Sequence, residues 1–130
     1  MKRVLLDTHV WIWWSVEAHK HLSRKALEAL EQAKDRWISA ISLWELAKLV
    51  ERGRIAFSIP LLEWMKRSLQ EEDISVAPLE PEICVESCSL QGFHRDPADQ
   101  LIVATARVHS IPLITADERI QKYPGVKTLW

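Results

Sequence analysis

Five acidic residues stand out because each lies where a strand should end or a helix should begin. They are Asp7, Glu45, Asp96, Asp99 and Asp117. A group of carboxylates without clustered cysteines or spaced histidines suits a hard divalent cation, Mg²⁺ or Mn²⁺. The acids outnumber the direct ligands that one ion needs, so either two ions bind or some acids act through water. The chemistry that uses such a group is phosphodiester hydrolysis, in which the ion polarises the phosphoryl group and activates water.

Each acid also has an ordinary structural interpretation. Glu45 would complete a capping box with Ser42, a pattern that opens many helices. Asp7, Asp96 and Asp117 stand where a helix is commonly capped. Capping alone does not explain why acids recur at several strand ends along one edge, where like charges repel each other. Taken together, the acids favour a cation site.

Strands and helices alternate along the chain. Short apolar runs predict strands at residues 3–6, 37–40, 74–77, 112–115 and 126–129. Helical spacing and cap signals predict helices at residues 9–16, 23–34, 42–53, 60–69, 81–92, 96–108 and 117–122. This alternation predicts an α/β fold, with a parallel sheet between layers of helices, in one domain over residues 1–130.

The predicted sheet explains where most of the acids should meet. In an open parallel sheet, the carboxyl ends of the strands and the starts of the following helices share the edge where ligands bind. Asp7, Glu45 and Asp117 each follow a predicted strand, so we expect them at that edge. Asp96 and Asp99 are not placed by this argument, because no confidently predicted strand immediately precedes them.

Composition excludes several other classes of protein. Lys and Arg total 17 and Asp and Glu total 18, so the formal net charge of −1 argues against a basic nucleic-acid coat. Three widely separated glycines exclude a glycine-rich phosphate loop. The apolar run near the N-terminus is interrupted by Asp7 and His9, which argues against a membrane span. Cys84 and Cys88 are expected to be reduced and to pack structurally, in a cytoplasmic protein.

Four segments resemble PIN domains of the VapC type, the ribonuclease toxins of bacterial and archaeal type II toxin–antitoxin pairs. They are LLDTHVWIWW (5–14), SLWELAKL (42–49), HRDPADQLIVATA (94–106) and LITADERI (113–120). The resemblance is collinear and covers essentially the whole chain. It implies a three-layer α/β/α, Rossmann-like sandwich around a mostly parallel sheet, and an Mg²⁺- or Mn²⁺-dependent endoribonuclease.

The resemblance also implies roles and partners. Asp7, Glu45, Asp99 and Asp117 would be catalytic and would hold one or two ions, with Asp96 as an accessory acid. VapC-type toxins usually form homodimers, and each is held inactive by a small antitoxin protein that blocks the site. The substrate would be RNA.

Other residues are candidates for supporting roles. Thr8 and Thr115, at strand ends, are expected to hydrogen-bond around the acids or to contact phosphate. The basic residues that could hold an RNA backbone are Lys48, Arg52, Arg54 and Arg95. Tryptophans near the acids could stack on bases, although core packing or contact with a partner is favoured. These are Trp11, Trp13, Trp14 and Trp44.

Two other functions stay open from the sequence. A phosphatase or phospho-acceptor domain also gathers acids around Mg²⁺, but aspartyl-phosphate enzymes favour Asp-x-Asp and the second position here is His9. A non-catalytic module would bind a metal and a partner without hydrolysing RNA. Setting the five acids aside leaves the rest of the chain with a net positive charge, so the overall charge does not exclude an RNA substrate.

Overall fold

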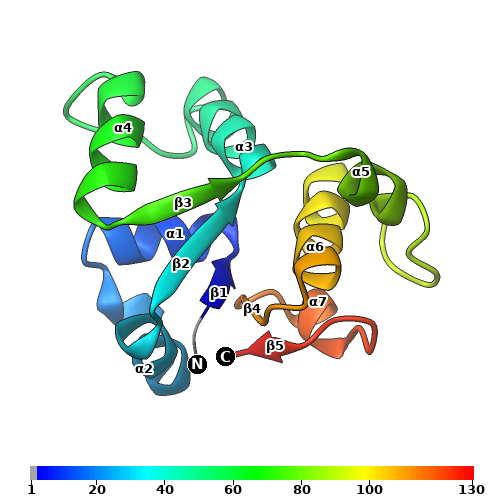
Figure 1. Ribbon diagram of the computed structural model, residues 1–130. Helices are drawn as coiled ribbons and strands as arrows, with labels where there is room; N and C mark the ends of the chain where they lie inside the picture. The colour runs from blue at the N-terminus through cyan, green and yellow to red at the C-terminus, as the bar shows by residue number, and fades with distance from the viewer. Residues whose placement is uncertain (1–2) are drawn as a thin grey trace.

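A parallel sheet forms the centre of residues 3–130, the part of the chain that the computed structural model describes (Figure 1). Its strands are β1 (Arg3–Leu6), β2 (Asp35–Ser39), β3 (Ile74–Ala77), β4 (Leu113–Ile114) and β5 (Thr128–Leu129). Their order is β3-β2-β1-β4-β5, and every neighbouring pair is parallel. The chain builds outward from β1 first on one side and then on the other. In such sheets, ligands bind at the carboxyl ends of the strands where the direction of building changes.

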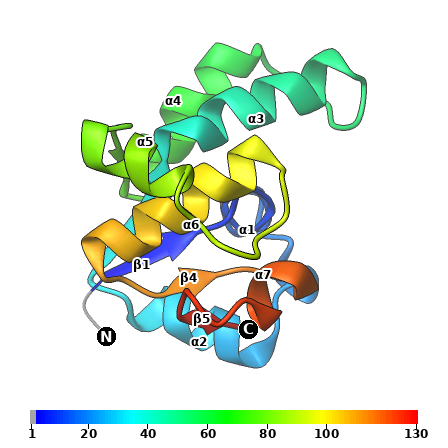
Figure 2. The same cartoon turned by 90° about the vertical axis from the view of Figure 1, so that its right-hand side faces the viewer.

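Helices cover both faces of this sheet. They are α1 (Thr8–Ser15), α2 (Arg24–Gln32), α3 (Ala40–Glu51), α4 (Leu61–Glu71), α5 (Pro81–Ser87), α6 (Pro97–His109) and α7 (Glu118–Lys122), with a 3₁₀ turn, η1 (His19–His21). Figure 1 shows α1, α2 and α4 on one side of the sheet and α5, α6 and α7 on the other. Turned by 90°, Figure 2 shows α6 in front of β1.

The central strand supplies both halves of the core. Val4 and Leu6 belong to the buried cluster that includes α1 and α2, whereas Leu5 packs with α6 and α7. Successive side chains of a strand point to opposite faces, so the continuous apolar run of β1 serves two helix layers. All three side chains are fully buried. This burial fixes the position of the residues that follow β1.

Helix α3 begins earlier than the sequence pattern suggests. The predicted capping box at Ser42 is wrong, because the helix starts at Ala40 and the hydroxyl of Ser39 accepts from Ile41 N at 3.2 Å. Ser42 is buried inside the helix, where its Oγ lies 2.8 Å from Thr8 Oγ1. Ser42 is therefore in the first turn of α3, where it makes a tertiary contact, rather than at its cap. Glu45 is therefore free of a capping role.

The predicted end of the same helix is confirmed. Gly53 has a φ of +70°, a conformation that glycine adopts without strain. Gly53 N donates to Val50 O at 3.0 Å and Arg54 N donates to Leu49 O at 2.8 Å. These two hydrogen bonds form a Schellman motif, which satisfies the last carbonyls of the helix.

Several other elements differ from their predicted limits. Strands β4 and β5 are two residues each, and α5 ends at Ser87 rather than near Gly92. The hydroxyl of Ser87 donates to Cys84 O at 2.7 Å, which satisfies a carbonyl near the end of that helix. The expected packing of Cys84 and Cys88 is wrong, since both thiols are free and exposed. Within residues 3–130, no helix has the length and apolar character needed to cross a bilayer.

Candidate active site

A cavity of about 380 Å³ gathers all five acids singled out in the sequence. Its lining consists of Asp7, His9, Val10, Trp13, Glu45, Asp96, Asp99, Ala116, Asp117 and Arg119. The contributing segments are the end of β1, the start of α1, α3, the start of α6 and the residues after β4. The cavity therefore lies at the carboxyl edge of the sheet, where the predicted strand ends meet. The structure also brings Asp96 and Asp99 to this edge, which the sequence argument did not do.

A second hollow, of about 540 Å³, is larger but does not gather the acids. It is lined by residues of α5, the end of α6 and the segment before β5. Its acid, Glu86, already accepts from Arg107 Nε at 2.5 Å. The smaller cavity is the candidate active site on chemical grounds.

Asp7 is held rigidly at the end of β1. Its Oδ1 accepts from Thr8 N at 2.8 Å, which caps α1, and its Oδ2 accepts from Thr115 Oγ1 at 2.6 Å. The backbone of Asp7 is fixed as well, because its N–H donates to Ile114 O at 3.0 Å. Burial raises the pKa of Asp7 in spite of the hydrogen bonds that favour the ionised form.

Glu45 reaches the cavity from α3. Its Oε1 accepts from Thr8 Oγ1 at 2.5 Å. Burial raises the pKa of Glu45, and the negative charges of Asp7 and Asp96 act in the same direction. The cavity therefore brings Glu45 close to other acids in a partly buried position.

Asp96 and Asp99 occupy the first turn of α6. Asp96 is the N-cap of this helix, with its Oδ1 accepting from Asp99 N at 3.1 Å, and Pro97 follows it at the first helical position. Asp99 is buried, and its Oδ2 lies 2.7 Å from His94 Nε2. Burial raises the pKa of Asp99 from 3.8 to about 6, and the charges of Asp7, Asp96 and Glu45 add to this while the hydrogen bond with His94 opposes it.

Asp117 differs from the other acids because a cation accompanies it. It caps α7, accepting from Arg119 N at 2.8 Å and Ile120 N at 3.2 Å. Arg119 Nη2 lies 3.4 Å from Asp117 Oδ2 and 3.8 Å from Asp99 Oδ2. Burial would raise the pKa of Asp117, but these hydrogen bonds and the Arg119 charge hold it below its usual value.

The donor atoms of this cavity fit a hard divalent cation. One carboxylate oxygen from each of Glu45, Asp96 and Asp99 lies within 4.8 Å of the others. The pKa values of Asp7, Glu45 and Asp99 are all raised, which reflects the cost of bringing buried negative charges together. Oxygen-only ligands of this kind are those that Mg²⁺ and Mn²⁺ prefer.

The supporting residues chosen from the sequence fall into two groups. Thr8 and Thr115 both hydrogen-bond to acids of the cavity. The basic residues that were predicted to hold an RNA backbone do not line the cavity. These are Lys48, Arg52, Arg54 and Arg95. Lys48 instead pairs with Glu51, with Nζ 3.0 Å from Oε1.

Sequence reasoning missed two residues of the cavity's surroundings. Arg119 was not considered, although its place in the first turn after Asp117 is a signal for a neighbouring charge. The other is His94, which contacts Asp99. Its contact with Asp99 spans five positions across a loop, and no helical or strand periodicity would reveal such a contact.

Comparison with known proteins agrees with this architecture. The PIN domain family model matches residues 4–126. Ribonuclease VapC22 of Mycobacterium tuberculosis (strain ATCC 25618 / H37Rv) is 39% identical over 133 residues, covering 100% of both chains. The chain therefore belongs to the PIN domain family and, within it, to the VapC type.

Solved structures share the fold at lower sequence identity. VapBC2 from Rickettsia felis, bound to a DNA fragment from its promoter, gives a TM-score of 0.70 at 15% identity, covering 97% of this chain and 96% of that one. VapBC-1 from nontypeable Haemophilus influenzae gives a TM-score of 0.68 at 20% identity, with 97% and 96% covered. The predicted three-layer α/β/α sandwich around a parallel sheet is confirmed.

Proposed function

We propose that this chain is the toxin of a type II toxin–antitoxin pair, an endoribonuclease that a small cognate antitoxin protein inhibits. The observation that carries the proposal is the convergence of five carboxylates in one cavity of about 380 Å³. The name of the 39% identical relative, a ribonuclease, supports the activity. Structural neighbours that are toxin–antitoxin complexes support the partner. The whole chain acts as one nuclease domain in the cytoplasm.

The cavity is proposed to hold Mg²⁺ or Mn²⁺, as one or two ions. Asp7, Glu45, Asp99 and Asp117 are the proposed ligands and catalytic residues. Asp96, whose carboxylate lies beside those of Glu45 and Asp99, supplements them. When bound, such an ion polarises the phosphodiester, lowers the pKa of water and stabilises the departing oxygen.

The chain's own residues orient the acids for this reaction. Thr8 and Thr115 hold Glu45 and Asp7 through their hydroxyls. Glu45, which has a raised pKa, accepts a proton from the attacking water. The new bond forms between the water oxygen and phosphorus as the bond to the 3′ oxygen breaks. The products are a 3′-hydroxyl and a 5′-phosphate.

Arg119 is proposed to contact the scissile phosphate. Its side chain is 63% exposed and lines the cavity beside Asp99 and Asp117. A guanidinium group matches the geometry of a phosphate and donates up to two parallel hydrogen bonds to it. The exposed basic residues of α3 and its exit turn, Lys48, Arg52 and Arg54, remain predicted contacts for more distant parts of the RNA. Arg95 and the homodimer also remain predictions.

The proposal is tested by RNA cleavage in vitro with purified protein. The wild-type protein should cleave RNA in the presence of Mg²⁺ or Mn²⁺, and cleavage should stop when EDTA is added. Asp7→Asn and Asp99→Asn should lose at least about 100-fold in kcat/KM, because each removes a charge that the ion requires. Asp35→Asn is the matched control, since Asp35 is exposed at the amino end of β2, whereas the cavity lies at the carboxyl edge of the sheet.

Two results would contradict the proposal. One is RNA cleavage by wild type that persists in EDTA. The other is full activity in folded Asp7→Asn and Asp99→Asn, each prepared free of wild-type enzyme. Thermal melting of each variant establishes that the protein is folded.

A further inference from the structure

An aromatic cluster leads from the acidic cavity to the C-terminus. Trp13 lines the cavity, and its ring centroid lies 5.8 Å from that of His9, 5.3 Å from His21 and 6.3 Å from Trp130. His9 and His21 are exposed, and Trp13 and Trp130 are partly exposed. Aromatic surface therefore begins at the cavity and continues beyond it.

The other tryptophans of α1 show what ordinary packing looks like here. Trp11 is fully buried, and its Nε1 donates to Ser68 Oγ at 2.8 Å. Trp14 stacks on His19 and carries the Arg36 guanidinium over its ring at 5.2 Å. Core packing explains Trp11, whereas Trp13, Trp14 and Trp130 are all partly buried against the same core cluster. Among the tryptophans of α1, Trp13 is the one that lines the cavity, and Trp130 continues its cluster away from it.

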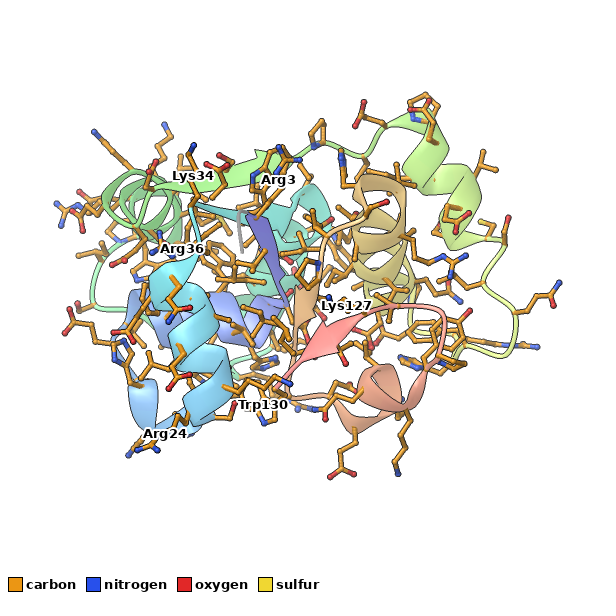
Figure 3. The ribbon with its side chains drawn as sticks, turned by 60° about the horizontal axis from the view of Figure 1, so that its bottom comes forward. Arg3, Arg24, Lys34, Arg36, Lys127 and Trp130 are labelled. Atoms are coloured by element: carbon orange, nitrogen blue, oxygen red, sulfur yellow. The ribbon has the colours of Figure 1, made fainter. Side chains whose placement is uncertain are left out.

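Basic side chains flank the C-terminal end of this cluster. Figure 3 shows Trp130 on the same side of the molecule as Arg24, at the start of α2, and Lys127, just before β5. Helix α2 contacts β5, which brings these two segments together. Arg24 and Lys127 are exposed, and within residues 3–130 neither forms an ion pair.

More basic residues extend the same face. Figure 3 also places Lys34, Arg3 and Arg36 on this side of the molecule. The guanidinium of Arg3 lies over the Trp37 ring at 4.6 Å, and Arg36 is held by Trp14, so Lys34 is the freer of the three. Arg24, Lys127 and Trp130 thus combine free positive charge with a partly exposed aromatic ring, whereas Arg3 and Lys34 lie at the amino ends of β1 and β2, away from the cavity.

We propose that the aromatic cluster and its basic flank bind unpaired RNA nucleotides next to the cleavage site. Bases would stack on Trp130 and on the rings around Trp13, while Arg24 and Lys127 contact the phosphates. Proteins bind single strands by this combination, which favours unpaired RNA because the base faces of a duplex are already stacked. The inference rests on the proposed ribonuclease function and adds the surface that binds the nucleotides beside the cleavage site.

Binding without cleavage tests the inference most directly. The probe is a fluorescein-labelled pool of random-sequence RNAs about 12 nucleotides long, titrated in EDTA and followed by anisotropy. Trp130→Ala should weaken binding by about 5- to 140-fold, the effect of losing one stacked base. Trp130→Phe should restore most of the affinity. The control is Leu62→Ala, since Leu62 is 64% exposed on α4 and does not line the cavity.

The salt dependence of RNA binding tests the basic flank independently, with substitutions at exposed residues that do not disturb the core. Lys127→Ala and Arg24→Ala should each reduce the slope of log K against log salt by about 0.7, the value for one phosphate contact on a single strand. This measurement keeps the inference testable if Trp130→Ala fails to fold. An RNA duplex of the same length should bind more weakly than the unpaired pool.

The results separate the inference from the proposed function. Unchanged affinity in folded Trp130→Ala, unchanged salt slopes, or duplex binding as tight as that of the pool would overturn it and leave this face for a protein partner. Binding that depends on Trp130 in a protein that never cleaves RNA would support the inference and contradict the proposed function. Metal-dependent cleavage by a protein whose RNA affinity does not depend on Trp130 would support the proposed function and contradict the inference.

Discussion

Thr8 orients two acids of the cavity at once. Its N–H donates to Asp7 and its hydroxyl donates to Glu45, so one residue fixes carboxylates from β1 and α3 relative to each other. The residue is 1% exposed, and its hydroxyl lies 2.8 Å from Ser42 Oγ and 2.5 Å from Glu45 Oε1. The geometry of the proposed metal site therefore depends on a residue that carries no charge.

Replacing Thr8 by Val should separate orientation from charge. Valine keeps the shape and the N–H but leaves Glu45 without its hydrogen bond, which should lower the free energy of unfolding by about 1–3 kcal/mol. We expect kcat/KM for RNA to fall about 10-fold or more, because Glu45 loses its fixed position. Thr8→Ser retains the hydroxyl and is the control. Wild-type kinetics in Thr8→Val would contradict the role assigned to this hydroxyl.

The raised pKa of Asp99 predicts how stability depends on pH without metal. The pKa rises from 3.8 to about 6 on folding, so the folded protein binds more protons between these values. The contribution of Asp99 to stability in EDTA should therefore be fully present below about pH 4 and be lost, by about 3 kcal/mol at most, as the pH rises through about 6. Urea unfolding at several pH values measures this change.

Asp99→Asn should flatten that dependence, because the variant has no group to ionise. Asp7 and Glu45, whose pKa values are also raised, should retain a slope of the same sign. Asp35→Asn, at an exposed position, should keep the wild-type profile. If the stability of Asp99→Asn depends on pH as that of wild type does, the Asp99 carboxyl is not the source of the pH dependence.

At the scale of the elements, three helices begin at the cavity, and an aspartate caps each. Asp7 caps α1, Asp96 caps α6 and Asp117 caps α7. Capping and cavity lining are compatible, because the cap bonds fix each carboxylate at the edge of the sheet. The structural interpretation of these three acids is confirmed, and their common place in the cavity is compatible with the proposed chemical one.

The limits of sequence reasoning follow from particular elements. The strand before Asp7 was predictable, because Val4, Leu5 and Leu6 form a continuous apolar run. The start of α3 was not, since Ser39 and Ser42 both fit a cap, and a contact between Ser42 and distant Thr8 decides between them. Asp96 and Asp99 could not be placed because α6 follows a loop rather than a strand.

The end of α3 gives a prediction at this scale. Gly53 is exposed with a φ of +70°, and a Cβ there would meet nothing within 4 Å. Gly53→Ala should therefore cost about 1 kcal/mol of stability through backbone strain alone. Gly53→Asn should cost less, since asparagine tolerates this conformation better. Equal stability of wild type and Gly53→Ala in urea unfolding would argue against the left-handed cap.

At the scale of the whole molecule, charge is separated by position. The acids that bring the net charge to −1 include five that share one cavity, while basic residues such as Arg24, Lys34 and Lys127 face another side (Figure 3). The fold and this separation were predictable from alternating elements and from the positions of the acids. The contacts of Arg119, His94 and Trp130 were not, because they depend on loops and on chain segments far apart in sequence.

The most direct test of a metal-dependent ribonuclease centre is sequencing of RNA ends in cells after induction of the protein. Wild type should produce new, discrete cleavage sites with 5′-phosphate and 3′-hydroxyl ends and should arrest growth unless the antitoxin is co-expressed. Asp7→Asn, expressed at the same level, should produce none of these ends. The same cleavage sites in wild type and Asp7→Asn would contradict the assignment of the acidic cavity as the active site.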